Sequence, residues 1–139
     1  MPCEFIMWFC AAWCMALIMD PRKRGKWGEE IALEYLKNKG YSVVATGFRS
    51  RFGEIDIIAK SKEYLVFAEV KTRKNASFAY AREYVGKDKQ RKLISTANYW
   101  LLKRPTKLQP RFDVIEIYAK HGEQTGSPEI IHIENAFET

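Results

Sequence analysis

Hydrophobic and polar positions follow two different periods along this chain. Residues 24–40 place apolar side chains at helical spacing and end at Gly40, a residue type that commonly follows a helix. Residues 86–104 predict a second helix, which stops before Pro105 because the residue before proline disfavours the α region. Segments rich in β-branched and aromatic residues predict strands at 41–49, 53–59, 63–72, 111–120 and 129–135. This order predicts an α/β domain with a mixed sheet flanked by helices.

The second and third predicted strands, 53–59 and 63–72, are apolar on both faces. Such strands are typical of the centre of a sheet that is covered on both sides. A tight turn at 60–63 would join them as a hairpin. Segment 77–85 is ambiguous and is interpreted as a loop or a short helix.

Three charged residues interrupt these apolar strands. Asp56 lies within the apolar run 55–59, and Glu69 and Lys71 share one face of the next strand because they are two residues apart. If the strands pair as a hairpin, Asp56 and Glu69 approach each other where burial makes like charges costly. A divalent cation such as Mg²⁺ or Mn²⁺ would resolve the repulsion and could polarise a phosphate, and Lys71 would stabilise the developing charge.

Two helical residues point toward the same region. Glu29 falls on the helical stripe of Ala32, Leu33 and Leu36, whereas Glu30, Glu34 and Lys37 form the polar face. Gln90 extends the predicted inward stripe of the second helix, formed by Leu93, Ile94, Ala97 and Leu101. Taken singly, each site residue has an ordinary explanation: a strand ion pair, a bulge cap, a helix N-terminal acid or a polar helix end. One shared pocket would explain all of them.

Net charge adds a partner class to this picture. The chain has 139 residues, enough for one domain, with 23 Lys and Arg against 17 Asp and Glu and a pI of about 9.2. This balance favours nucleic acid or a membrane surface as a partner, although a simply basic protein is an open alternative. Basic residues near the carboxylates could contact phosphates without reading base sequence: Arg22, Lys23, Arg24, Arg49, Arg51, Arg73, Lys74, Lys87, Lys89, Arg91 and Lys92.

The N-terminal segment 1–19 differs from the rest of the chain. It holds one charged residue, Glu4, and all three cysteines, so no disulfide framework is predicted for residues 20–139, which fits a reducing cytoplasm. Its apolar run, 5–19, is shorter than the about 20 residues that a membrane-spanning helix needs. Three interpretations stay open: a short membrane anchor at the inner membrane, an extra helix packed on the domain, or, as we favour, an extension upstream of the native start.

The motifs carry a family resemblance. "GEEIALEYL" (28–36), "GEIDIIA" (53–59) and "VFAEVKTR" (66–73) are similar to the PD-(D/E)XK nuclease superfamily, and more narrowly to the bacterial YraN family, which is related to archaeal Holliday-junction resolvases. The similarity covers about residues 22–137 and includes "KDKQRKL", "RFDV" and "HIENAF". The chain departs from the family at Ala68, where Val is usual, and at Gly47, where Asn is frequent nearby.

The resemblance implies a restriction-endonuclease-like αβββαβ core in residues 20–139 and a bacterial, cytoplasmic endonuclease. Asp56, Glu69 and Glu29 would bind Mg²⁺ or Mn²⁺, Lys71 would be the catalytic lysine, and Gln90 would match a polar position on the second helix. The expected substrate is branched, flapped or single-stranded DNA, since no recognition helix or zinc module is evident. Resolvase relatives act as dimers, so a homodimer is compatible, although no surface predicts its interface. The alternative hypothesis is a nucleic-acid-binding protein on the same fold that does not cut, and either activity could be tethered through residues 5–19.

Overall fold

The structure of the protein is a computed structural model that describes residues 21–74 and 85–138. The extension 1–19 and all but the last residue of the ambiguous segment 77–85 lie outside the described residues. In chain order the described elements are α2 (Pro21–Asn38), β1 (Ser42–Ser50), β2 (Gly53–Lys60), β3 (Tyr64–Arg73), α3 (Lys87–Lys103), β4 (Gln109–Tyr118), η3 (Gly122–Gln124) and β5 (Glu129–Phe137). The predicted order of helices and strands is confirmed.

A single five-stranded sheet runs in the order β1-β2-β3-β4-β5. β3 and β4 are parallel, and the other neighbours are antiparallel. Since parallel neighbours need a long crossover, α3 occupies the connection between β3 and β4. The predicted mixed sheet is therefore confirmed, and its pattern agrees with the αβββαβ core.

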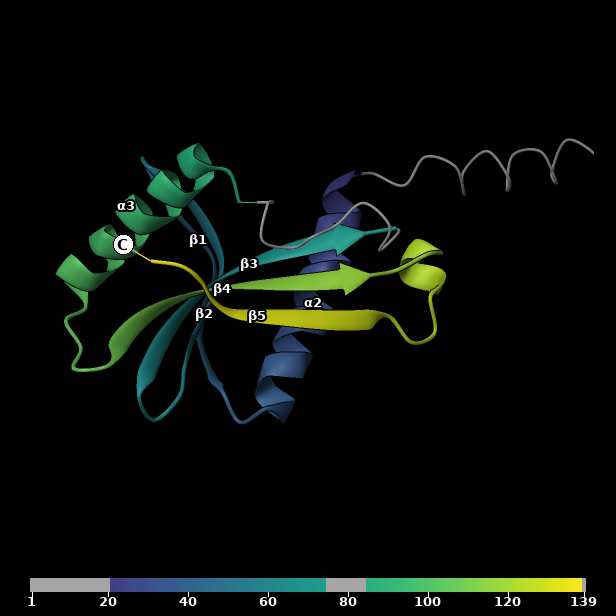
Figure 1. Ribbon diagram of the computed structural model, residues 1–139, viewed down its shortest axis with the longest axis horizontal. Helices are drawn as coiled ribbons and strands as arrows, with labels where there is room; N and C mark the ends of the chain where they lie inside the picture. The colour runs from purple at the N-terminus through teal and green to yellow at the C-terminus, as the bar shows by residue number, and fades with distance from the viewer. Residues whose placement is uncertain (1–20, 75–84, 139) are drawn as a thin grey trace, which may run out of the picture.

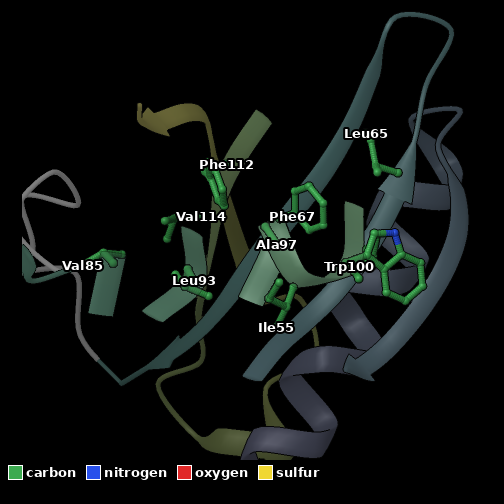
Figure 2. Close-up of a cluster of buried hydrophobic side chains, with 10 residues drawn as sticks. Ile55, Leu65, Phe67, Val85, Leu93, Ala97, Trp100, Phe112 and Val114 are labelled. Atoms are coloured by element: carbon green, nitrogen blue, oxygen red, sulfur yellow. The ribbon is translucent and has the colours of Figure 1, made fainter. Parts of the chain in front are cut away.

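The two helices cover opposite faces of the twisted sheet (Figure 1). On one face, α2 packs Ala32 and Leu36 against a cluster that includes Ile57 and Ile115. On the other face, α3 contributes Leu93, Ala97 and Trp100 to a second cluster, which Figure 2 shows around Phe67 and Phe112. β2 and β3 are thus central strands buried on both sides, as their composition predicts.

Local signals end the first helix and shape the hairpin. Gly40 has a φ of 92°, which favours glycine, and its N–H donates to the Lys37 carbonyl while that of Tyr41 donates to the Leu36 carbonyl. These bonds form a Schellman motif, so Gly40 is the residue that follows the helix, as predicted. In the turn between β2 and β3, the Tyr64 N–H donates to Ser61 Oγ at 3.1 Å.

The predicted inward stripe of α3 is partly wrong. The buried residues are Leu93, Thr96, Ala97 and Trp100, whereas Ile94 and Leu101 are half-buried at the border. Thr96 tolerates complete burial because its hydroxyl donates to the Lys92 carbonyl at 2.7 Å. The helix is therefore rotated relative to the prediction, which turns Lys89 toward the sheet.

In the part of the chain that the structure describes, no helix has both the length and the apolar composition needed to cross a membrane.

Candidate active site

The site begins where β2 and β3 stop pairing. Lys60 pairs with Leu65 at one end of this register and Ile57 pairs with Ala68 at the other. The pairing therefore ends at Ile57, the immediate neighbour of Asp56. Ile57 packs in the cluster under α2 and Ile55 in the cluster under α3, so the strand's regular alternation breaks at Asp56. The Asp56 Oδ2 atom instead accepts the Val70 N–H at 2.8 Å. The predicted hairpin is confirmed, and its end fixes Asp56 beside Glu69.

Glu69 is a buried carboxylate with unequal oxygens. Its side chain is 7 % exposed, and its Oε1 lies 3.4 Å from both Lys71 Nζ and Lys89 Nζ. Its Oε2 is buried without a hydrogen-bond partner among the described residues. An unsatisfied buried carboxylate oxygen is costly, so its presence indicates either a strained site or a position for a missing partner.

Electrostatics link Asp56 to the neighbouring acids. Burial first, and repulsion from Glu69 second, raise the pKa of Asp56 from 3.8 to about 7, although the Val70 N–H opposes the rise. Burial, followed by repulsion from Glu54 and Glu69, also raises the pKa of Glu29. Asp56, Glu69 and Glu29 therefore lie near enough to repel one another. Glu54 acts on Glu29 at the edge of this set, although the sequence analysis did not include it.

These acids do not form a closed metal shell. Among the described residues, no three His, Cys, Asp or Glu side chains are arranged to hold a metal ion. Asp56 and Glu69 lie side by side at the end of the hairpin, and Glu29 faces them from α2 as a half-buried flanking charge. The predicted ligand set is brought into one electrostatic cluster, while metal binding itself stays a prediction.

Lys89 contacts the site, and Gln90 has a different local role. The side-chain nitrogen of Gln90, Nε2, donates to the Val85 carbonyl at 2.7 Å, next to the start of α3. This contact matches the alternative explanation of a polar residue at a helix end. The rotated helix directs Lys89 to Glu69 instead. The spacing of Lys89 with Leu93, Thr96 and Trp100 could have revealed this, had the polar Thr96 been included in the inward stripe.

The other basic residues fall into two groups. Arg49 pairs with Glu54, Arg91 with Asp88, and Arg73 with the fully buried Glu116, so each has a protein partner. Arg49 and Arg91 are nevertheless exposed, as are Arg51, Lys74, Lys87 and Lys92, so these six could meet phosphates. The side chains of Arg22, Lys23 and Arg24 lie outside the described residues. Nucleic-acid contact stays a prediction for all of them.

A second buried charge network was not predicted. Arg111 donates to both oxygens of Asp113 at 2.9 and 2.8 Å, His132 Nε2 lies 2.7 Å from Asp113 Oδ2, and the Asn135 N–H donates to Oδ1 at 3.1 Å. These residues belong to "RFDV" and "HIENAF", and Asp113 and His132 stand in apolar strands as Asp56 does. Both oxygens of Asp113 are satisfied, so this network has the properties of a structural one.

The chain is similar to known proteins over most of its length. The model of the "Uncharacterised protein family UPF0102" matches residues 28–117. A UPF0102 protein of Persephonella marina is 44% identical over 116 residues, which are 83% of this chain and 93% of that protein. A UPF0102 protein of Clostridioides difficile is 40% identical over 120 residues, covering 86% of this chain and 100% of that protein. One of Acetivibrio thermocellus is 42% identical over 121 residues, or 85% and 93% of the two chains. The chain therefore belongs to the UPF0102 family, the YraN family that its motifs resemble.

Proposed function

We propose that this protein is a divalent-metal-dependent endonuclease that hydrolyses phosphodiester bonds in DNA. The observation that carries the proposal is the pair of neighbouring carboxylates at the end of the β2–β3 hairpin. Glu69 has a buried oxygen without a hydrogen-bond partner among the described residues, and Asp56, held by the Val70 N–H, lies near enough for repulsion from Glu69 to raise its pKa. A fold gains no stability from this arrangement unless a further cationic group completes it.

The donor chemistry suits Mg²⁺ or Mn²⁺. Carboxylate oxygens are hard ligands, and Mg²⁺ commonly uses one or two carboxylates together with water and substrate phosphate. Asp56 and Glu69 would hold the ion, with Glu29 at the flank, so a protein shell of three ligands is not required. The bound ion would polarise a phosphoryl oxygen and lower the pKa of a coordinated water.

The chain's own residues supply position and charge. The Val70 N–H fixes Asp56 at 2.8 Å, so the carboxylate cannot turn away from Glu69 without losing that bond. Lys71 and Lys89 each lie 3.4 Å from Glu69 Oε1, where they can exchange that contact for a phosphate oxygen. In hydrolysis, a water oxygen bonds to phosphorus as the bond to the leaving ester oxygen breaks, and these lysines would stabilise the charge on the phosphate.

A non-catalytic nucleic-acid-binding protein is the second candidate. The observation that favours it is that two lysines already pair with Glu69 and that the described residues form no three-ligand site. In this case the basic residues behind the net charge of +6 would bind phosphates, and no phosphodiester bond would be cleaved. The two candidates differ in whether a chelator and a change at Asp56 matter.

The test is a cleavage panel of linear, single-stranded, flapped and four-way-junction DNA with Mn²⁺, Mg²⁺ or EDTA. The wild type is expected to cut at least one branched or single-stranded substrate with metal only, and Asp56→Asn and Lys71→Ala to lower the rate at least about 100-fold. Glu34→Ala, at an exposed position of α2, is the matched control and should cut normally. Absence of cleavage would leave the binding-only candidate, and equal cleavage by Asp56→Asn would overturn the proposed site.

A further inference from the structure

Aromatic and cationic side chains gather at the surface where the β1–β2 turn meets α3. Phe52, in the β1–β2 turn, is 38% exposed, and its ring meets that of Tyr99 edge-to-face at 6.4 Å between centroids. The Arg51 guanidinium lies 4.8 Å from the Phe52 centroid, and Lys103 Nζ lies 4.9 Å from that of Tyr99. We name these four residues the aromatic platform. An aromatic ring exposed among cations, next to the half-buried Tyr99, indicates an interaction surface.

The platform is held in place by the turn beneath it. The Phe52 N–H donates to Ser50 Oγ at 3.1 Å, and Ser50 Oγ donates to the buried Thr96 at 3.3 Å. Behind Tyr99, Phe48 stacks at 6.4 Å and meets Trp100 of the α3 core edge-to-face at 4.9 Å. The turn and α3 are therefore joined by hydrogen bonds and rings, so Phe52 stays in solvent instead of folding onto the core.

One side of α3 connects the platform with the carboxylates. Lys89, Lys92, Thr96, Tyr99 and Lys103 follow one another at steps of three and four residues, so they share a side of the helix. Lys89 contacts Glu69 at one end, and Tyr99 lies ten residues further on, about 15 Å along the axis. A few nucleotides of one strand would span this length. Lys92 is exposed between the two ends.

We propose that the platform stacks an unpaired base of a nucleic-acid strand, with Arg51, Lys92 and Lys103 on its phosphates. That the bound strand continues to the carboxylates rests on the proposed function. Every base has a π-face, so such a platform binds without sequence preference, but a base inside a duplex does not offer that face. The surface therefore selects single-stranded, flapped or unpaired junction DNA over continuous duplex.

The test measures binding apart from cleavage. Fluorescence anisotropy in EDTA would compare a labelled single-stranded 12-mer with a blunt duplex of the same length. Phe52→Leu/Tyr99→Leu keeps apolar side chains but removes both rings, and is expected to weaken single-strand binding about 10–100-fold while duplex binding changes less than about twofold. Phe52→Tyr/Tyr99→Phe should keep the affinity. Leu102→Ala, at an 81% exposed apolar position of the same helix, is the matched control and should have no effect.

A second measurement reports stacking directly. A single-stranded 12-mer with 2-aminopurine should change its fluorescence on binding the wild type and not on binding Phe52→Leu/Tyr99→Leu. The proposal is overturned if the leucine variant binds single strands like the wild type, or if its single-strand and duplex affinities fall equally. Loss of self-association in that variant, with single-strand binding intact, would assign the surface to a second copy of the chain and overturn it as well. If single-strand binding does not depend on the rings but cleavage is observed, the platform is overturned and the proposed function stands. If binding depends on the rings but no cleavage is observed, the proposed function is overturned and the platform stands.

Discussion

Two buried carboxylates in this protein show how differently a fold can treat the same chemical group. Asp113 has partners on both oxygens, and although burial alone would raise its pKa, hydrogen bonds from His132 and Arg111 hold the pKa below the ordinary value. Glu69 has two lysines on one oxygen and no hydrogen-bond partner for the other within the described residues. A fully satisfied network stabilises a fold, whereas a half-satisfied one reduces stability and is retained where function needs it.

The raised pKa of Asp56 predicts an unusual pH dependence. The pKa of the Asp56 carboxyl is about 7 in the folded protein and 3.8 at its ordinary value. Between these two pH values the folded protein therefore binds more protons at this group than the unfolded chain does. The free energy of unfolding of the metal-free wild type should therefore fall as pH rises from about 4 to 7. Asp56→Asn cannot titrate and retains an oxygen for the Val70 N–H. We expect it to be more stable than the wild type at pH 8, by on the order of 1–3 kcal/mol, and similar at pH 4.

Urea unfolding at pH 4, 6 and 8 in EDTA measures this difference. Repeating it at pH 8 with MnCl₂ gives the control, because a cation that binds the folded wild type should stabilise it and not Asp56→Asn. A variant that is no more stable than the wild type at pH 8, with an equal response to Mn²⁺, would contradict both the buried charge and the metal position.

At the scale of elements, the approach of α2 to β3 sets the position of Glu29. Gly28 is buried, and a Cβ atom at this residue would overlap Thr72 Oγ1 and come within 3.8 Å of Ile117 Cδ1. Glycine therefore lets the helix backbone lie directly on the strand. Because Glu29 is the next residue, this close packing also determines how near its carboxylate comes to Glu69.

Gly28→Ala is expected to lower the free energy of unfolding by about 1–3 kcal/mol, since α2 must move away from β3. Gly25→Ala is the matched control: a Cβ there has no neighbour within 4 Å, so the higher helix propensity of alanine should leave stability unchanged or raise it by up to about 1 kcal/mol. Thr72→Ala in the Gly28→Ala background removes the overlapping atom and should restore part of the loss. Thermal unfolding of the four proteins checks this. Equal stability of Gly28→Ala and Gly25→Ala would rule out the close contact.

At the scale of the whole molecule, the Asp113 network joins parts that are far apart in sequence. Asp113 and Arg111 lie in β4, His132 in β5, and Tyr41, whose hydroxyl accepts from Arg111 at 2.9 Å, follows α2. The guanidinium also lies 4.7 Å from the Tyr64 ring centroid, at the start of β3. One buried ion pair thereby ties β4 and β5 to Tyr41, which directly follows the helix that carries Glu29.

Asp113→Asn should lower the free energy of unfolding at pH 7 by about 3–5 kcal/mol, because the buried Arg111 would keep only the half-exposed Glu134, 3.8 Å away, as a counter-charge. Since the folded pKa of Asp113 is depressed, the stability it contributes is present above its ordinary value of 3.8 and is lost as pH falls further. The gap between variant and wild type should therefore narrow between pH 5 and 3.

Denaturant unfolding at pH 7, 5 and 3 tests this expectation. Asp88→Asn is the control, because it removes an ion pair whose acid is 89% exposed and should change stability by less than about 1 kcal/mol. Similar losses for the two variants would show that the buried network does not stabilise the assembly of the sheet.

The parts of the site that were predictable are those close together in sequence. Glu69 and Lys71 share a face because strands alternate, and Asp56 meets Glu69 because a short turn pairs the two strands. The sequence predicts Lys89 only as a phosphate contact, because a helical wheel gives directions around an axis but not the rotation of the helix on the sheet. That rotation followed from burying Thr96 and Trp100, and burial of Thr96 depends on a hydrogen bond within the helix.

The sequence by itself determined the order of the elements, the central hairpin and the three charges that it carries, because hydrophobic periods and turn residues act over a few positions. The tertiary structure decided which oxygen of Glu69 the lysines contact, that Glu29 lies near enough to repel Asp56, and that Arg111, Asp113 and His132 satisfy one another. It also brought the turn at Phe52 against Tyr99. These outcomes depend on the distances between elements that packing sets, and a pattern along one chain does not contain those distances.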